Sequence, residues 1–169
     1  VPVQVICPVV FVAICYYMIG LQGAIFRFFR ACMVAVVTAL SGMAVGTVAG
    51  AAFSDINMAL VILPLILLPL MMFSGLFVNV GSLPVYFAWI KWISPMKYAY
   101  AALMKNEYEG LVFKNCKEAC SGELVLQQMS MDGGLSIPEN IGTLFGMYII
   151  LMIVGFISLA IMSTKRMKH

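Results

Sequence analysis

Two cysteines are the side chains best placed to do chemistry, because Cys116 and Cys120 lie four residues apart in the most polar part of the chain. Such a pair forms a disulfide in an oxidising compartment. A zinc site would need further cysteines or histidines at matching spacing, and the only histidine is the last residue. We predict an intrachain Cys116–Cys120 bridge and no metal site, with an intersubunit bridge or free thiols as alternatives. Cys7, Cys15 and Cys32 lie in apolar stretches and are predicted to be small buried hydrophobes.

The common catalytic motifs are absent from the sequence, which has no G-x-x-x-x-G-K-[ST] phosphate loop, no HExxH and no GxSxG. Its long apolar stretches contain no Asp, Glu, Lys or Arg, which argues against a proton-coupled transporter or a channel with charged rings. We therefore predict no catalytic residue in the 169-residue chain. A molecule crossing it would meet an apolar or weakly polar path.

The structural elements that must position these residues are indicated by stretches without charge. Four such stretches occur, at residues 1–26, 31–54, 56–90 and 140–164. Spanning a bilayer takes about 20 apolar residues. The chain is 63% hydrophobic and 10% charged, whereas a soluble domain carries roughly 25% charge. The sequence thus predicts an all-α membrane protein and nearly excludes a soluble enzyme. About four transmembrane helices are predicted, near residues 3–21, 31–53, 58–78 and 141–163.

The remaining large segment is residues 80–139. Its first half is rich in Trp, Tyr, Pro and Lys, a composition typical of the bilayer–water interface. The composition of this half predicts a re-entrant or interfacial helical hairpin. The second half is predicted to form a small extracellular loop domain. Glu139 or Asn140 is the predicted N-cap region of the last span.

The C-terminal tail indicates the topology. Lys165, Arg166 and Lys168 account for the net charge of +3, so the excess charge is a juxtamembrane anchor and not a nucleic-acid surface. The positive-inside rule places this tail in the cytoplasm, and the loop 80–139 is then extracytoplasmic. Arg27 and Arg30, predicted to bracket a short loop, fall on the outer side against that rule.

Small residues and prolines mark two of the spans. Gly42, Gly46 and Gly50 recur every fourth residue, so they share one helix face where another helix backbone can approach closely. Packing within the chain is the favoured interpretation, and a subunit interface is the alternative. Pro64 and Pro69 lie inside the third span, where each removes a helical hydrogen bond and should kink or unwind the helix.

An ordered set of short motifs resembles the membrane domain of ATP-binding cassette transporters of the G subfamily, the White-like and breast-cancer-resistance-protein-like half-transporters. These motifs are Phe73-Ser74-Gly75-Leu76-Phe77-Val78-Asn79, Leu83-Pro84, Trp89, Trp92-Ile93-Ser94-Pro95-Met96-Lys97-Tyr98, Ala102-Leu103, Asn106-Glu107-Tyr108-Glu109-Gly110-Leu111 and Cys116. The resemblance covers the whole chain, residues 1–169, as the last four of six membrane helices in an ABC-2 type domain. It implies a longer polypeptide with an N-terminal nucleotide-binding domain that holds ATP and Mg.

The resemblance also implies roles for single residues. Leu76 and Phe77 would form the outer plug of the substrate path, Leu68 and Met71 would face the cavity, and Gln4 would tune specificity. The implied partners are a second half-transporter, the bilayer and a hydrophobic small-molecule substrate. The plasma membrane or an intracellular vesicle membrane would host the protein. Cys116 and Cys120 fit the intrachain disulfide of the family's outer loop.

Two functions from different classes fit this outline. The first is the membrane part of an ATP-driven exporter of lipid-like or amphipathic small molecules. The second is a four-span scaffold of tetraspanin type, which four helices and a large last outer loop would also fit. Tetraspanins typically carry a Cys-Cys-Gly motif and at least four loop cysteines, and this loop has two cysteines and no such motif. The sequence favours the transporter.

Overall fold

The computed structural model describes residues 2–21, 25–53, 55–76, 90–111, 121–129 and 134–166. Helices make up most of these residues, and the bounds of the elements follow in chain order. They are α1 (Pro2–Ile19), α2 (Ile25–Ala52), α3 (Ile56–Met71), the π-helical turn η1 (Met72–Leu76), α4 (Ile90–Ile93), α5 (Pro95–Tyr108), α6 (Gly122–Gln128) and α7 (Ile137–Arg166).

Two of these helices are long and apolar enough to cross a membrane, namely α2 and residues Ile137–Ile161 of α7. The apolar segments Val3–Ile19 and Asn57–Met71 are shorter. The predicted all-α fold is confirmed for the part of the chain described here, and the count of four transmembrane helices stays a prediction. Regular α geometry continues through both prolines of α3 and gives way to the π-helical turn only at Met72.

The second membrane span begins earlier in the structure than the sequence predicted. The helix α2 starts at Ile25, six residues before the predicted start at 31, so Arg27 and Arg30 lie in its first turns and do not bracket a loop. The prediction failed because it began the helix where the charge-free stretch begins, at residue 31. A helix of 28 residues is about 42 Å long and extends beyond the roughly 30 Å hydrocarbon core.

The last span also begins earlier than predicted, because a capping box precedes it. Ser136 is followed three residues later by Glu139, and the backbone N–H of Ser136 donates to Glu139 Oε2 at 2.7 Å. The predicted N-cap residue Asn140 is instead buried inside the first turns of α7. Its amide nitrogen donates to the carbonyl oxygens of Leu135 and Ser136. At the start of α3, Asp55 caps the helix by accepting from the backbone N–H of Asn57 at 3.0 Å.

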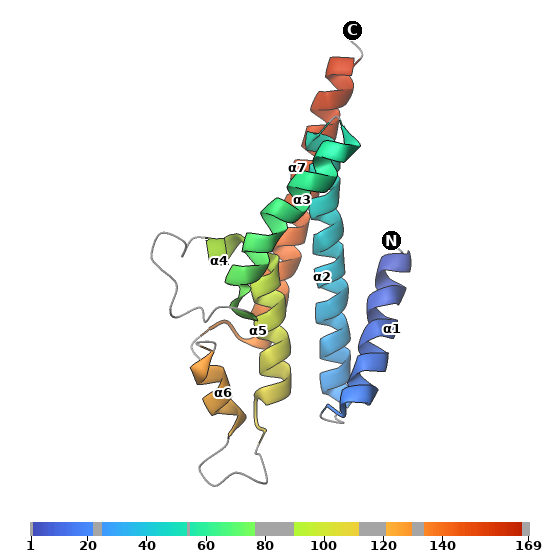
Figure 1. The fold of residues 1–169 in the computed structure, drawn as a ribbon. Coiled ribbons are helices and arrows are strands. Elements are labelled where there is room, and N and C mark those ends of the chain that lie inside the picture. Colours follow the sequence, from blue (N-terminus) through green and yellow to red (C-terminus); the bar gives the residue numbers. More distant parts are fainter. Residues whose placement is uncertain are drawn as a thin grey trace.

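The buried core lies where α2, α5 and α7 meet (Figure 1). Its members are Val34, Val37, Tyr98, Ala99, Ala102 and Leu144. Further along, α7 approaches α2 closely at Gly155, where a Cβ atom would lie 3.3 Å from Thr47 Oγ1. The short, partly buried helix α5 thus packs against both of the two longest helices, which also contact each other.

Chain segments separate to two ends of this bundle. Figure 1 shows the end of α1, the start of α2 and α6 at one end, and the start of α3 with the C-terminus at the other. Hydrogen bonds from Arg27 on α2 to carbonyl oxygens at the end of α5 agree with this arrangement. Which end faces the cytoplasm stays a prediction.

Candidate functional site

The predicted path residues Leu68 and Met71 lie on α3. Four apolar side chains with alternating spacings of four and three residues, Val61, Leu65, Leu68 and Met72, share one face of the helix. They are 71%, 69%, 59% and 49% exposed, and we call them the α3 row. Met71 lies beside the row and is half-buried. The row is an apolar surface that no described part of the chain covers.

The α3 row ends in a tight turn, which explains the Phe-Ser-Gly motif. Ser74 is 2% exposed, and its hydroxyl donates to the Met71 carbonyl oxygen at 2.6 Å. Gly75 has φ 97°, a conformation that glycine adopts without strain. Leu76 ends the turn, so the predicted plug position directly follows the α3 row. Phe77 and the side chain of Leu76 lie outside the described residues.

A buried serine connects the start of α5 to the end of α3 through a hydrogen bond. Ser94, just before α5, is fully buried, and its hydroxyl donates to the Leu70 carbonyl oxygen at 2.9 Å. Nearby, the hydroxyl of the buried Tyr98 donates to the Trp92 carbonyl oxygen at 3.1 Å. The Trp-Ile-Ser-Pro motif therefore positions α5 against the end of α3.

Gln4 comes from a different part of the bundle. It is half-buried on α1, whose main contacts are with α2, so it shares neither a helix nor a face with Leu68 and Met71. Its Oε1 atom is buried and accepts no hydrogen bond from any described residue. The structure therefore gives Gln4 an unused acceptor, but does not group it with the other path residues.

The glycine stripe of α2 is open in this structure. A Cβ atom built at Gly42, Gly46 or Gly50 would meet nothing within 4 Å. The close helix contact inside the described bundle uses Gly155 of α7 instead. Any helix that packs on the stripe is therefore not one of the described helices, and the stripe stays a predicted packing surface.

The predicted disulfide lies outside the described residues, because Cys116 and Cys120 both fall in the gap between 111 and 121. The two flanks of this gap meet, since the Gly122 N–H donates to the Leu111 carbonyl oxygen at 2.7 Å. The other three cysteines are free thiols. Cys32 is buried as predicted, whereas Cys7 is exposed on α1 and Cys15 is half-buried.

Sequence reasoning missed a polar cluster that joins α2 to the end of α5. The Arg27 guanidinium donates to the carbonyl oxygens of Asn106 at 3.0 Å, Glu107 at 3.2 Å and Glu109 at 3.0 Å. In return, Asn106 Nδ2 donates to the Arg27 carbonyl oxygen at 2.9 Å. An arginine that satisfies the free carbonyl groups at a helix C-terminus also complements the helix dipole. The one signal in the sequence was that Arg27 violated the positive-inside preference.

Comparison with known proteins defines the class. Residues 1–108 match the ABC-2 type transporter family, so the chain belongs to that family. The protein White of Ceratitis capitata is 31% identical over 99% of this chain and 25% of its own length. The ATP-binding protein/permease wht-1 of Caenorhabditis elegans is 28% identical over 96% of this chain and 26% of its own length.

Further similarity narrows the class to one subfamily. The broad substrate specificity transporter ABCG2 of Bos taurus is 27% identical over 78% of this chain and 22% of its own length. The chain is a membrane domain of the G subfamily of half-transporters, as its motifs predicted. It spans about a quarter of the length of these relatives. The scaffold of tetraspanin type has no support from these matches.

Proposed function

We propose that this chain forms the membrane path of an ATP-driven exporter of lipid-like or amphipathic small molecules. The observation that carries the proposal is the exposed α3 row, which runs into the buried Ser74–Gly75 turn just before the plug position. A row of Val, Leu and Met offers dispersion contacts and burial of apolar area. It offers no fixed charge, so it suits an apolar or amphipathic substrate better than an ion.

The motor would lie outside this chain. ATP and Mg would bind a nucleotide-binding domain elsewhere in the polypeptide, and a second half-transporter would complete the cavity against the α3 row. Closure of the nucleotide-binding domains would narrow the cavity and move substrate past Leu76 and Phe77. The substrate drives no change by itself and acts only through its different affinities for the two states. Gln4, with its unused acceptor, would select among substrates.

The proposed orientation puts the C-terminus in the cytoplasm and the loop 80–139 outside. Its support is the separation of the chain into two ends, because Arg27 and Glu109 lie together at the end of the bundle opposite the last turns of α7. An epitope appended after residue 169 should be accessible to antibody only in permeabilised cells. Accessibility in intact cells would contradict the orientation.

The α3 row can be tested in the full-length polypeptide by comparing two alanine variants of the same helix. Leu68→Ala trims the row, whereas Ile66→Ala trims a side chain of similar exposure, 53% against 59%, that points about 130° away from the row, given 100° per residue. We expect Leu68→Ala to raise the KM for dye-stimulated ATP hydrolysis, with rhodamine 123 as the amphipathic dye, and Ile66→Ala to leave it unchanged. Equal effects would contradict a path along the α3 row.

The plug is tested by Phe77→Ala in inside-out vesicles that contain the full-length polypeptide. The variant should still bind the dye and hydrolyse ATP, but accumulate less dye for each ATP hydrolysed. Phe156→Ala is the matched control, because Phe156 is a 74% exposed phenylalanine on α7, four helical turns or more from the start of that helix and outside the plug motif. Unchanged dye accumulation in Phe77→Ala would remove the plug role.

A further inference from the structure

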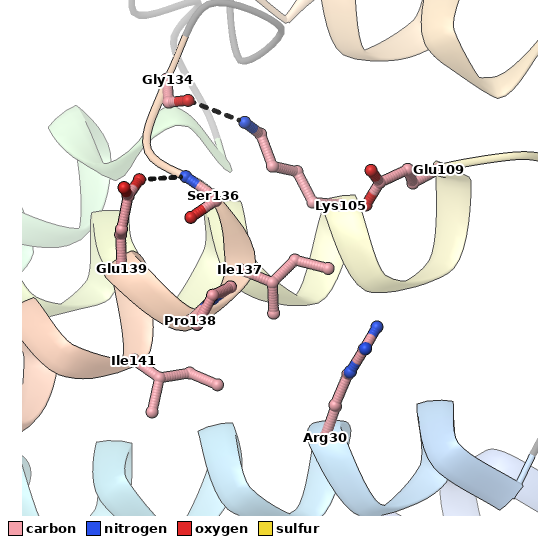
Figure 2. A pocket seen from close by; sticks show the side chains of 9 residues that line it. All are labelled: Arg30, Lys105, Glu109, Gly134, Ser136, Ile137, Pro138, Glu139 and Ile141. Atoms are coloured by element: carbon pink, nitrogen blue, oxygen red, sulfur yellow. Dashed lines mark hydrogen bonds between the residues drawn. The ribbon is translucent and has the colours of Figure 1, made fainter.

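A cavity of about 770 Å³ opens between the starts of α2 and α7 and the end of α5, away from the α3 row. Figure 2 shows Arg30 reaching into it from α2, Lys105 and Glu109 from α5, and the apolar side chains of Ile137 and Ile141 from α7. Charged groups, among them Glu139 of α7, and apolar groups thus line one pocket.

Two opposite charges in this pocket have no partner among the residues that the structure describes. Within the described ranges, neither the Arg30 guanidinium nor the Glu109 carboxylate makes a hydrogen bond or an ion pair, and both residues are exposed. Arg27, one turn earlier on α2, uses its guanidinium on three carbonyl oxygens. Lys105 Nζ donates to the carbonyl oxygens of Gly134 and Leu135 at 3.0 Å each. Its ammonium group has three protons, so one is left for a ligand.

The pocket lies at the depth where lipid head groups lie. Arg30 is the last charge on α2 before the charge-free stretch 31–54, and Glu139 is the last charge on α7 before the stretch 140–164. Because Arg30 and Glu139 both line this pocket, the two borders fall at one level. The pocket therefore straddles the boundary between the hydrocarbon core and the polar layer.

An apolar row leads from the pocket into the hydrocarbon. Ile137, Ile141, Phe145 and Ile149 follow at every fourth residue of α7, so each lies one turn above the one before, and the row winds about 120° around the helix from Ile137 to Ile149. Ile137 is buried and Ile141 half-buried at the pocket, whereas Phe145 and Ile149 are 47% and 43% exposed. An acyl chain that leaves the pocket can continue along this row.

We propose that this pocket binds the head group of a zwitterionic phospholipid, with phosphate on Arg30, ammonium on Glu109 and one acyl chain along the α7 row. The planar fork of Arg30 matches two phosphate oxygens, and the third proton of Lys105 supports them. An anionic lipid would place its phosphate near Arg30 but leave Glu109 without a cation. Free phosphate would leave both Glu109 and the α7 row without a partner.

The test uses the purified full-length polypeptide in dodecyl maltoside and counts bound lipid by native mass spectrometry. Phosphatidylethanolamine is the probe, and phosphatidylglycerol with the same acyl chains carries a neutral glycerol in place of the ammonium-bearing ethanolamine. We expect tighter binding of phosphatidylethanolamine. The variant Arg30→Gln should weaken the first bound phosphatidylethanolamine by about tenfold or more, since a hydrogen bond to a charged group is worth at least one decade of affinity.

A second variant separates the two charges. Glu109→Gln should abolish the preference for phosphatidylethanolamine while keeping the binding of phosphatidylglycerol. Glu123→Gln removes an exposed carboxylate on α6, outside the pocket, and should change neither lipid. If Arg30→Gln does not fold, Arg30→Lys replaces it, because a single ammonium keeps the charge but loses the bidentate contact.

Three results would overturn the proposal. They are unchanged phosphatidylethanolamine binding in the Arg30 variant, equal binding of the two lipids by the unmodified protein, and displacement of the lipid by equimolar phosphoethanolamine. The last result would assign the pocket to a soluble zwitterion. The inference does not depend on the transported substrate. Dye-stimulated ATP hydrolysis by the same variants therefore distinguishes a loss of lipid binding in the pocket from a loss of transport.

Discussion

Replacing Arg27 by Gln should release the end of α5 from α2. The guanidinium makes three hydrogen bonds to carbonyl oxygens, two of them part-buried and one exposed. A hydrogen bond to a charged group contributes roughly 1.5–3 kcal/mol, and exposure to water lowers this value. Counting the part-buried pair at the low end and the exposed bond at a fraction of that, we expect a loss of about 3 kcal/mol of local stability.

Hydrogen exchange on the full-length polypeptide measures this loss directly. A loss of about 3 kcal/mol raises the population of the locally open state, and the exchange rate of its amides, by about a hundredfold. The affected amides include those of Glu109 and Leu111, which donate to Lys105 and Tyr108. Arg30→Gln is the matched control, because Arg30 lies on the same helix without such bonds. An acceleration below about threefold in the Arg27 variant, or an equal one in the control, would refute the reasoning.

Three further substitutions test the local structure, each read out as thermal stability of the purified full-length polypeptide. Gly75→Ala should destabilise the protein by about 1–3 kcal/mol, since alanine is strained at φ 97°. Gly46→Ala is the control and should not destabilise it, because a Cβ atom there would meet nothing within 4 Å. Equal shifts of the unfolding midpoint in the two variants would contradict this account. Ser94→Ala should cost about 1–2 kcal/mol by leaving the Leu70 carbonyl oxygen without its donor, and an unchanged midpoint would rule that bond out as a support. Glu139→Ala should lower the unfolding midpoint by opening the capping box, whereas Glu139→Gln should retain most of the stability.

The helices themselves could be predicted because the bilayer imposes length and polarity on them. Apolar runs located α1 and the middle of α2 and α7 to within a few residues, but they could not locate helix ends. The start of α2 continues past the charges of Arg27 and Arg30, since a helix ends where its backbone groups find other partners. The capping box of Ser136 and Glu139 was readable in the sequence and would have placed the start of α7 correctly.

Contacts between distant segments could not be predicted from one sequence. Nothing in the composition indicates that Arg27 meets Asn106, 79 residues away, or that Ser94 donates to Leu70. The pocket around Arg30 was missed for the same reason, because its charges come from α2, from the C-terminal end of α5 and from the start of α7. The α3 row, by contrast, follows from helical periodicity alone, and its exposure needed only the structure to show that nothing else in the described chain covers it.

The bonds of Arg27 also set an order on synthesis. Ribosomes add roughly 5–20 residues per second, so Asn106, 79 residues downstream, emerges about 4–16 s after Arg27 at that speed. Throughout this interval the nascent α2 presents a guanidinium with no carbonyl partner from α5. A chain that stalls before residue 106 lacks all three carbonyl partners of this guanidinium. The contact between α2 and the end of α5 can thus form before the last helix is made.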